Sequence, residues 1–201
     1  MSPIQTKDNR TPQQGLGGLL SDTFNAPRDV FSYETVKFSG RLEILDRERR
    51  VARFVRHQRI RFLEDKVGVF MDRVWGEGVL FAGYAAPGLR MLEPIRTPKG
   101  YVVPLQLPRP FRQGDVFDLV TERRIIGAFY HPLAYWDTAM SAPTELISIE
   151  VIVPPSADIR RPEIVAPARG DMDATQRQRS LEFRVARPAV NIPYKLAWSW
   201  Q

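Results

Sequence analysis

Alternation of apolar and polar side chains with a period of two residues is the feature that most restricts how this chain folds. It is clearest in the run ELISIEVIVP, where Ile147, Ile149 and Val151 alternate with Ser148 and Glu150. Successive side chains of a β-strand point to opposite faces, so this alternation predicts a half-buried strand. Similar short runs follow one another, separated by turn signals roughly every 8–12 residues, with no long helical pattern between them. The sequence therefore predicts an all-β fold, an antiparallel β-sandwich of the Ig-like or jelly-roll-like type.

Composition divides the chain into an arm and a domain. Residues 1–32 are rich in Gln, Gly, Pro, Asn and Asp, which does not support a packed core and predicts a flexible N-terminal tail or arm. Residues 33–201 carry the alternating runs and are predicted to form the sandwich domain. Within this domain, residues 155–180 are polar and contain several prolines. They predict a long late loop that crosses a sandwich edge, forms an arm or carries binding residues.

Two sets of apolar and aromatic side chains are candidates for contact with a protein partner. The first lies in the N-terminal arm, where the spacing would place its members on one face of a short docking helix; it comprises Leu16, Leu19, Leu20 and Phe24. The second accompanies residues 131–143, which show no alternation and predict an irregular loop. It comprises Tyr130, Tyr135 and Trp136. Large aromatic side chains are typical of binding surfaces when they are exposed.

A further aromatic row lies in the last predicted strand, YKLAWSW. Its members share one strand face, because they are spaced two residues apart; they are Tyr194, Leu196, Trp198 and Trp200. Each large aromatic buries roughly 150–250 Å², so the row is either part of the core or, if exposed, a surface for a partner.

Basic side chains cluster in the predicted strand VARFVRHQRIRF. Four of them share one face of the strand, opposite an apolar set that includes Phe54; they are Arg53, His57, Arg59 and Arg61. Such a row could follow the phosphates of a nucleic acid. Alternatively, the row is a solvated sheet face whose arginines pair with acids on neighbouring strands, such as Glu43. The net charge of +6 is compatible with either interpretation, since 23 acidic residues are interspersed among 29 basic ones.

Motifs for catalysis and cofactor binding are not found in the sequence. The chain has no cysteine, which excludes disulfides, thiol catalysis and cysteine-ligated zinc. Its two histidines, His57 and His131, do not have the spacing of a metal site. The nucleophile elbow, the phosphate-binding loop and the dinucleotide fingerprint are missing. We therefore predict no catalytic residues, no metal ligands and no cofactor.

Three segments resemble an all-β domain of uncharacterised bacterial cytoplasmic proteins, some of them regulators with a separate DNA-binding helix-turn-helix. They are FRQGD at 111–115, PTE at 143–145 leading into a Val/Ile strand that ends at Pro154, and the closing strand at 194–200. The resemblance covers about half of the chain and implies a sensing or interaction module. No helix-turn-helix segment precedes the domain, so a DNA-binding role is not implied.

These observations predict a non-catalytic protein-interaction or assembly module of a bacterial cytoplasmic system. A cytoplasmic location is expected because the N-terminus is polar and no segment approaches the roughly 20 apolar residues of a membrane span. A protein partner or a second copy of the chain is the expected ligand. The alternative is a nucleic-acid or phosphate-binding module that uses the arginine-rich strand, and an enzyme without a recognisable motif comes third.

Overall fold

A computed structural model describes residues 32–46, 48, 51–98, 100–129, 131, 133–140, 143–157, 159–165, 171–177 and 179–200. All regular elements in these ranges are β-strands, which confirms the predicted all-β fold. Because helices are missing from the described ranges, none is present there that could cross a bilayer. The N-terminal candidates Leu16, Leu19, Leu20 and Phe24 lie outside the described residues.

The alternating runs of the sequence correspond to long strands, and shorter strands fill the intervals between them. In chain order, the strands are β1 (Tyr33–Ile44), β2 (Val51–Phe62), β3 (Val67–Trp75), β4 (Val79–Ala85), β5 (Arg90–Met91), β6 (Ile95–Thr97), β7 (Gly100–Phe111), β8 (Val116–Ile126), β9 (Leu133–Thr138), β10 (Leu146–Ile152), β11 (Ile159–Val165), β12 (Asp171–Gln176), β13 (Ser180–Ala186) and β14 (Tyr194–Trp200).

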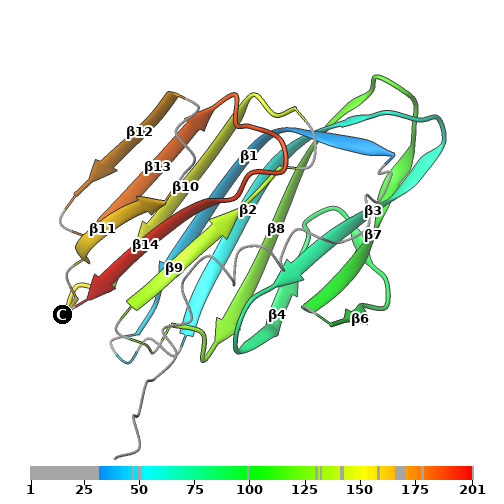
Figure 1. Ribbon diagram of the computed structural model, residues 1–201. Coiled ribbons are helices and arrows are strands. Elements are labelled where there is room, and N and C mark those ends of the chain that lie inside the picture. Colours follow the sequence, from blue (N-terminus) through cyan, green and yellow to red (C-terminus); the bar gives the residue numbers. More distant parts are fainter. Residues whose placement is uncertain are drawn as a thin grey trace, which may run out of the picture.

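The strands form one large sheet and two smaller ones. The large sheet has the order β12-β13-β10-β1-β2-β8-β4, and the smaller sheets are β11-β14-β9 and β3-β7-β5, with β6 also paired to β7. In Figure 1 the three-stranded sheet lies in front of the large sheet, and β3, β7 and β6 lie to its right. This layered arrangement is consistent with the predicted sandwich.

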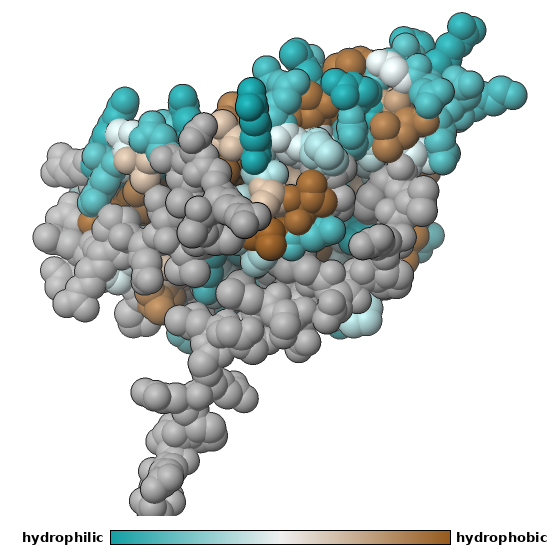
Figure 2. Space-filling view, turned by 45° about the horizontal axis from the view of Figure 1, so that its top comes forward, coloured by the Kyte–Doolittle hydropathy of each residue, from teal (hydrophilic) through white to brown (hydrophobic). Residues whose placement is uncertain are grey.

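Strand β2 shows how both smaller sheets cover the same face of the large sheet. Its apolar side chains Phe54 and Phe62 have the same parity and are 4% and 0% exposed. The ring of Phe54 packs on Trp136 of β9, with centroids 4.3 Å apart, while Phe62 stacks on Phe111 of β7 at 4.5 Å. The core therefore lies between the inner face of the large sheet and the two smaller sheets. In the view of Figure 2, hydrophilic side chains project along the upper edge of the molecule and apolar ones are exposed between them.

The closing aromatic row contributes to this core. Tyr194, Leu196 and Trp198 are at most 1% exposed. The core interpretation of these three residues is therefore confirmed, while the side chain of Trp200 lies outside the described part of the chain.

One strand pair departs from the predicted antiparallel arrangement. Strands β1 and β10 pair in parallel, with Lys37 opposite Leu146. The start of this pairing is held by the Thr144 hydroxyl, which donates a hydrogen bond to the Thr35 carbonyl at 2.8 Å. Alternation determines which face of a strand is buried, but it carries no information about the direction of the neighbouring strand. For this reason the sequence predicted β10 but not its orientation.

Two segments that were predicted to be irregular contain strands. The predicted loop at 155–180 includes β11 and β12, which lie at the edges of different sheets. The chain thus leaves the large sheet at β10, crosses to the three-stranded sheet and returns, as one of the three alternatives proposed. Edge strands are frequently polar because one edge faces solvent, so their alternation is weak in the sequence.

The second such segment, 131–143, contains β9, so the prediction of an irregular loop there was also wrong. In this strand the apolar side chains Leu133 and Tyr135 are 60% and 42% exposed, whereas the small Ala134 and the polar Thr138 are buried. Since apolar side chains lie on both faces of β9, with Trp136 packed inward on Phe54, the usual sequence pattern of a half-buried strand is missing.

Candidate functional site

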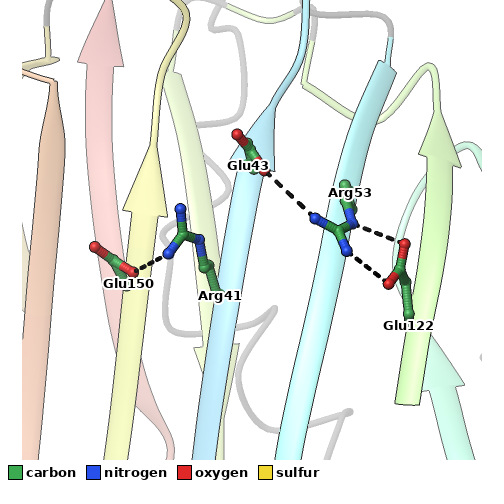
Figure 3. A network of polar contacts seen from close by, with 5 residues as sticks. All are labelled: Arg41, Glu43, Arg53, Glu122 and Glu150. Atoms are coloured by element: carbon green, nitrogen blue, oxygen red, sulfur yellow. Dashed lines mark hydrogen bonds and ion pairs between the residues drawn. The ribbon is translucent and has the colours of Figure 1, made fainter. Parts of the chain in front are cut away.

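The arginine row on β2 is paired with acids of the neighbouring strands. The guanidinium group of Arg53 donates two hydrogen bonds of 2.7 Å to the Glu122 carboxylate on β8. It also lies 4.0 Å from Glu43 on β1. Figure 3 shows these contacts together with the ion pair between Arg41 and Glu150 on the next two strands.

The next arginines of the row are paired in the same way. Arg59 donates hydrogen bonds of 2.9 and 3.0 Å to both carboxylate oxygens of Asp118, and Arg61 donates one of 2.8 Å to Glu34. These pairs lower the pKa of the Asp118 and Glu122 carboxyls, chiefly through the hydrogen bonds from Arg59 and Arg53. His57 is exposed on the same strand. The arrangement matches the second interpretation of this row, a solvated face with cross-strand ion pairs.

The opposite face of β2 holds a buried charged group. The side chain of Arg56 is 9% exposed and forms an ion pair with Asp72 of β3, which is 2% exposed. The Tyr84 hydroxyl on β4 donates a hydrogen bond of 2.6 Å to the other oxygen of Asp72. Burial, together with the nearby Asp72 charge, raises the pKa of the Tyr84 phenol. Three strands of two sheets therefore converge on one carboxylate.

A second arginine, Arg123 of β8, belongs to the same group. It is 7% exposed. Burial and the neighbouring charge of Arg56 lower the pKa of Arg123 to about 10, against the opposing effect of Asp72. At neutral pH the guanidinium is therefore still charged. Its carbon atom Cζ lies 5.1 Å from the centroid of the Phe54 ring, so the cation also contacts an aromatic face.

Two cavities flank this charged group, and Trp75 lines both of them. The smaller, of about 120 Å³, includes Arg56 and Asp72 in its lining. The larger, of about 220 Å³, is the one we call the β9 pocket. Its lining comprises Trp75, Gly76, Glu77, Leu80, Arg123, Ile125, Ala128, Phe129, His131, Leu133, Ala134, Tyr135, Trp136 and Asp137.

The β9 pocket combines apolar walls with unsatisfied hydrogen-bond donors. The Nε atom of Arg123 and the Nε1 atom of Trp136 are buried, and neither has a hydrogen-bond partner among the described residues. Buried donors have a hydrogen-bond partner in the great majority of cases. Two donors without one, on residues that line the same pocket, therefore require an explanation. Leu133 and Tyr135 line the same pocket and are exposed.

Of the two acids that line the β9 pocket, Asp137 already has partners. The indole of Trp75 donates a hydrogen bond to Asp137, and the cation of Lys195 lies nearby; both contacts favour its charged form, although burial has the larger effect and raises the pKa of Asp137. Lys195 of β14 is opposite Asp137 in the sheet. Its Nζ atom lies 3.8 Å from the centroid of the Tyr135 ring. The acid and the lysine thus offset each other.

Part of the predicted partner site lies in this pocket. Tyr135 and Trp136 both line it, whereas Tyr130 lies outside the described residues. The buried residues Arg56 and Arg123 were missed. A signal for them exists in the sequence, because both occupy the apolar parity of their strands, where a charged side chain must be buried with the rest of that face.

No cluster of three or more histidine and acidic side chains with suitable geometry for a metal ion is present among the residues that the structure describes.

Comparison with known proteins informs the fold alone. The sequence matches no family model and no curated protein. Similar solved structures include the M1 zinc metallopeptidase from Deinococcus radiodurans, with 13% identity over 82% of this chain and 42% of that one, at a TM-score of 0.51. A candidate protease from Parabacteroides distasonis has 10% identity over 84% and 40% of the two chains, also at 0.51.

This chain thus spans about two fifths of the length of the structures it resembles. One of these, at a TM-score of 0.51, is described as a two-domain M1 zinc metallopeptidase. At such low identity the similarity shows a shared fold, and the resemblance to a bacterial interaction domain stays a prediction.

Proposed function

We propose that this domain is a non-catalytic module that binds a protein partner through the β9 pocket and its rim. The observation that carries the proposal is the outward position of Leu133 and Tyr135, which are 60% and 42% exposed at a pocket with apolar walls. Binding surfaces typically have an apolar, aromatic centre and a polar rim. Here Glu77 and His131 provide exposed polar groups of the lining.

Binding, in preference to catalysis, is supported by the state of the polar groups. Of the two acids that line the pocket, the half-buried Asp137 is held by Trp75 and Lys195, whereas Glu77 is exposed. The donors of Arg123 and Trp136 and the apolar wall of the pocket remain available. Such a combination suits recognition of a side chain or small group of a partner.

Nucleic-acid binding through the arginine row has less support. Arg53, Arg59 and Arg61 each pair with a carboxylate of a neighbouring strand. A phosphate would have to displace these acids, so the row offers little free positive charge.

The test is selection from a displayed peptide library on the full chain. We expect the enriched peptides to lose binding to Leu133→Asp, which places a charge at the rim of the pocket. They should still bind Val116→Asp, a matched control at another exposed apolar position, 50% exposed on β8. Peptides that bind Leu133→Asp unchanged, or a library that yields no binder, would contradict the proposal.

A second copy of this chain is one form that the partner could take. In that case the mass by light scattering would exceed the monomer mass of 23.1 kDa, and Leu133→Asp would return it to the monomer value.

A further inference from the structure

The charges between the sheets do not balance. Of the two buried guanidinium groups, that of Arg56 forms an ion pair with Asp72, and that of Arg123 is acted on by the same carboxylate without an ion pair of its own among the described residues. The remaining titratable groups in contact with them are Tyr33 and Tyr84, whose pKa values burial raises, so both stay neutral. The described residues of this group therefore carry one uncompensated positive charge. A buried charge without a counter-charge is costly, and an anion would offset it.

The β9 pocket gives an anion access to this charge. Arg123 lines the pocket, and its Nε is a buried donor without a hydrogen-bond partner in the described part of the chain. Trp136, which also lines the pocket, carries a second such donor, its Nε1 atom. Both are N–H groups, so they can only donate and require an acceptor.

The other charged groups that the structure describes around the pocket do not provide an acceptor for the Nε of Arg123 or the Nε1 of Trp136. Asp137 on β9 is offset by Lys195 on β14 and accepts a hydrogen bond from Trp75. Glu77, between β3 and β4, is exposed, and its charge acts on Tyr135. His131 is exposed in the loop before β9. The acids that affect Arg123 are Asp72 and the phenol of Tyr84, and neither lines the β9 pocket.

The size of the pocket limits what the anion can be attached to. Its volume is about 220 Å³. A cavity of about 150 Å³ accommodates benzene, whereas pockets for drug-sized molecules start at about 300 Å³. The β9 pocket thus has room for one apolar side chain with a small anionic group. Its apolar walls, which include Leu80, Ile125 and Phe129, match such a side chain.

We propose that the β9 pocket binds the apolar C-terminal residue of a partner polypeptide, whose α-carboxylate accepts a hydrogen bond from Arg123. Trp136 offers a second donor, and the exposed Leu133 and Tyr135 contact the residues that precede the terminus. This inference rests on the proposed function, because it specifies the part of the protein partner that enters the pocket. A free carboxylate on an aromatic ring has the same chemistry without the polypeptide, and the experiment separates the two sources.

The experiment compares four probes by titration into the full chain: acetyl-Gly-Gly-Phe, its C-terminal amide, phenylacetate and benzyl alcohol. Binding is followed by the NMR signal of the Trp136 indole N–H, which is assigned with Trp136→Phe. We expect the peptide acid to bind at least roughly tenfold more tightly than the amide, as a hydrogen bond to a charged group requires. We also expect the Trp136 indole proton to shift downfield.

Matched variants connect the effect to Arg123. Arg123→Met should remove the preference for the acid, while Arg124→Met, which makes the same charge change at an exposed position on the other face of β8, should retain it. If Arg123→Met does not fold, Trp136→Phe provides the second test. Its phenyl ring keeps an aromatic contact for Phe54 but removes the donor, so the preference for the acid should fall several-fold.

Three outcomes would overturn the inference. Equal affinity for the acid and the amide would contradict recognition of the α-carboxylate but would leave the proposed function intact. Binding of phenylacetate without binding of the peptide acid would make the pocket a site for small aromatic acids. No binding of any probe, with library peptides still dependent on Leu133, would place partner contact at the rim and leave the pocket unused.

Discussion

Arg56 on β2 and Arg123 on β8 are diagonal neighbours on the inner face of the large sheet; Arg56 forms an ion pair with Asp72, and the charge of Asp72 also acts on Arg123. The register aligns Arg56 with Thr121, two residues from Arg123. Like charges at neighbouring positions of a sheet face repel each other. Asp72, which reaches them from the four-stranded sheet, is therefore the group that allows both arginines to be buried.

Replacement of Asp72 by Asn should strongly destabilise the fold. Removal of one partner of a buried ion pair costs about 3–5 kcal/mol, because the other charge stays buried without compensation. Urea denaturation would measure the loss. The matched control is Asp118→Asn, which breaks the exposed pair with Arg59 and should cost much less. An equal effect of the two substitutions would show that Asp72 does not hold a buried charge.

Stability should fall as the pH rises above about 10. The pKa values of Tyr33 and Tyr84 are raised above the ordinary 10.0 by burial, so the folded state keeps protons that the unfolded chain loses. The resulting loss is about 1.4 kcal/mol per tyrosine for each pH unit above 10. The double variant Tyr33→Phe, Tyr84→Phe should lose less stability over this range.

The measurement for the alkaline range is urea denaturation at several pH values, with tyrosinate absorbance as an independent readout. Arg123, whose pKa is lowered to about 10, acts in the opposite direction, since the folded state releases that proton first. The Tyr84 phenol raises the pKa of Arg123, so its removal in the double variant lets Arg123 release its proton earlier and changes the difference in the same direction. Identical pH profiles for the two proteins would contradict the prediction.

The outer face of the sheet should contribute to stability in the acidic range. The pKa values of Asp118 and Glu122 are lowered from 3.8 and 4.5 by Arg59 and Arg53. Their contribution is therefore present above about pH 4.5 and is lost as the pH falls through the lowered values. We expect Asp118→Asn with Glu122→Gln to flatten the dependence of the unfolding free energy on pH below 4.5. An unchanged slope would show that the pairs do not persist in solution.

The turn between β3 and β4 should not tolerate a side chain at Gly78. Its φ is +80°, and a Cβ atom there would lie 2.2 Å from the carbonyl oxygen of Ile126. Gly78→Ala should cost about 3 kcal/mol or more, from backbone strain and the clash together. Gly88 has a similar φ of +77° but open space around it, so Gly88→Ala should cost only about 1 kcal/mol. Thermal or urea denaturation of both variants distinguishes the clash from the strain, and equal losses would exclude the clash.

The long strands were predictable because their alternation is strong. In β2, for example, the even positions from Ala52 to Phe62 are buried without exception. The same rule predicted that Tyr194, Leu196 and Trp198 share one strand face, and the structure buries all three. Strand β9 does not follow the rule, because apolar Leu133 and Tyr135 face outward while the inner face carries Ala134, Trp136 and the polar Thr138. Alternation reports burial only where the apolar side chains point inward.

The candidate site was only partly predictable. Aromatic character pointed to Tyr135 and Trp136, because large aromatics in a segment without alternation are typical of binding surfaces when they are exposed. The donor that gives the pocket its charge, Arg123, lies on the buried face of β8, and the carboxylate that acts on it, Asp72, comes from another sheet. Contacts between sheets depend on the topology, and the sequence pattern of one strand carries no information about them.

The parallel pair of β1 and β10 has a consequence for the order of folding during synthesis. The two ends of its first contact, Thr35 and Thr144, are 109 residues apart. At roughly 5–20 residues per second, about 5–20 s separate the synthesis of these two residues on the ribosome. During this interval the edge of β1 that later pairs with β10 has no neighbouring strand. Open strand edges of this kind can pair with strands of other chains. The nascent protein therefore has a period of vulnerability to aggregation that ends only when β10 (Leu146–Ile152) has emerged.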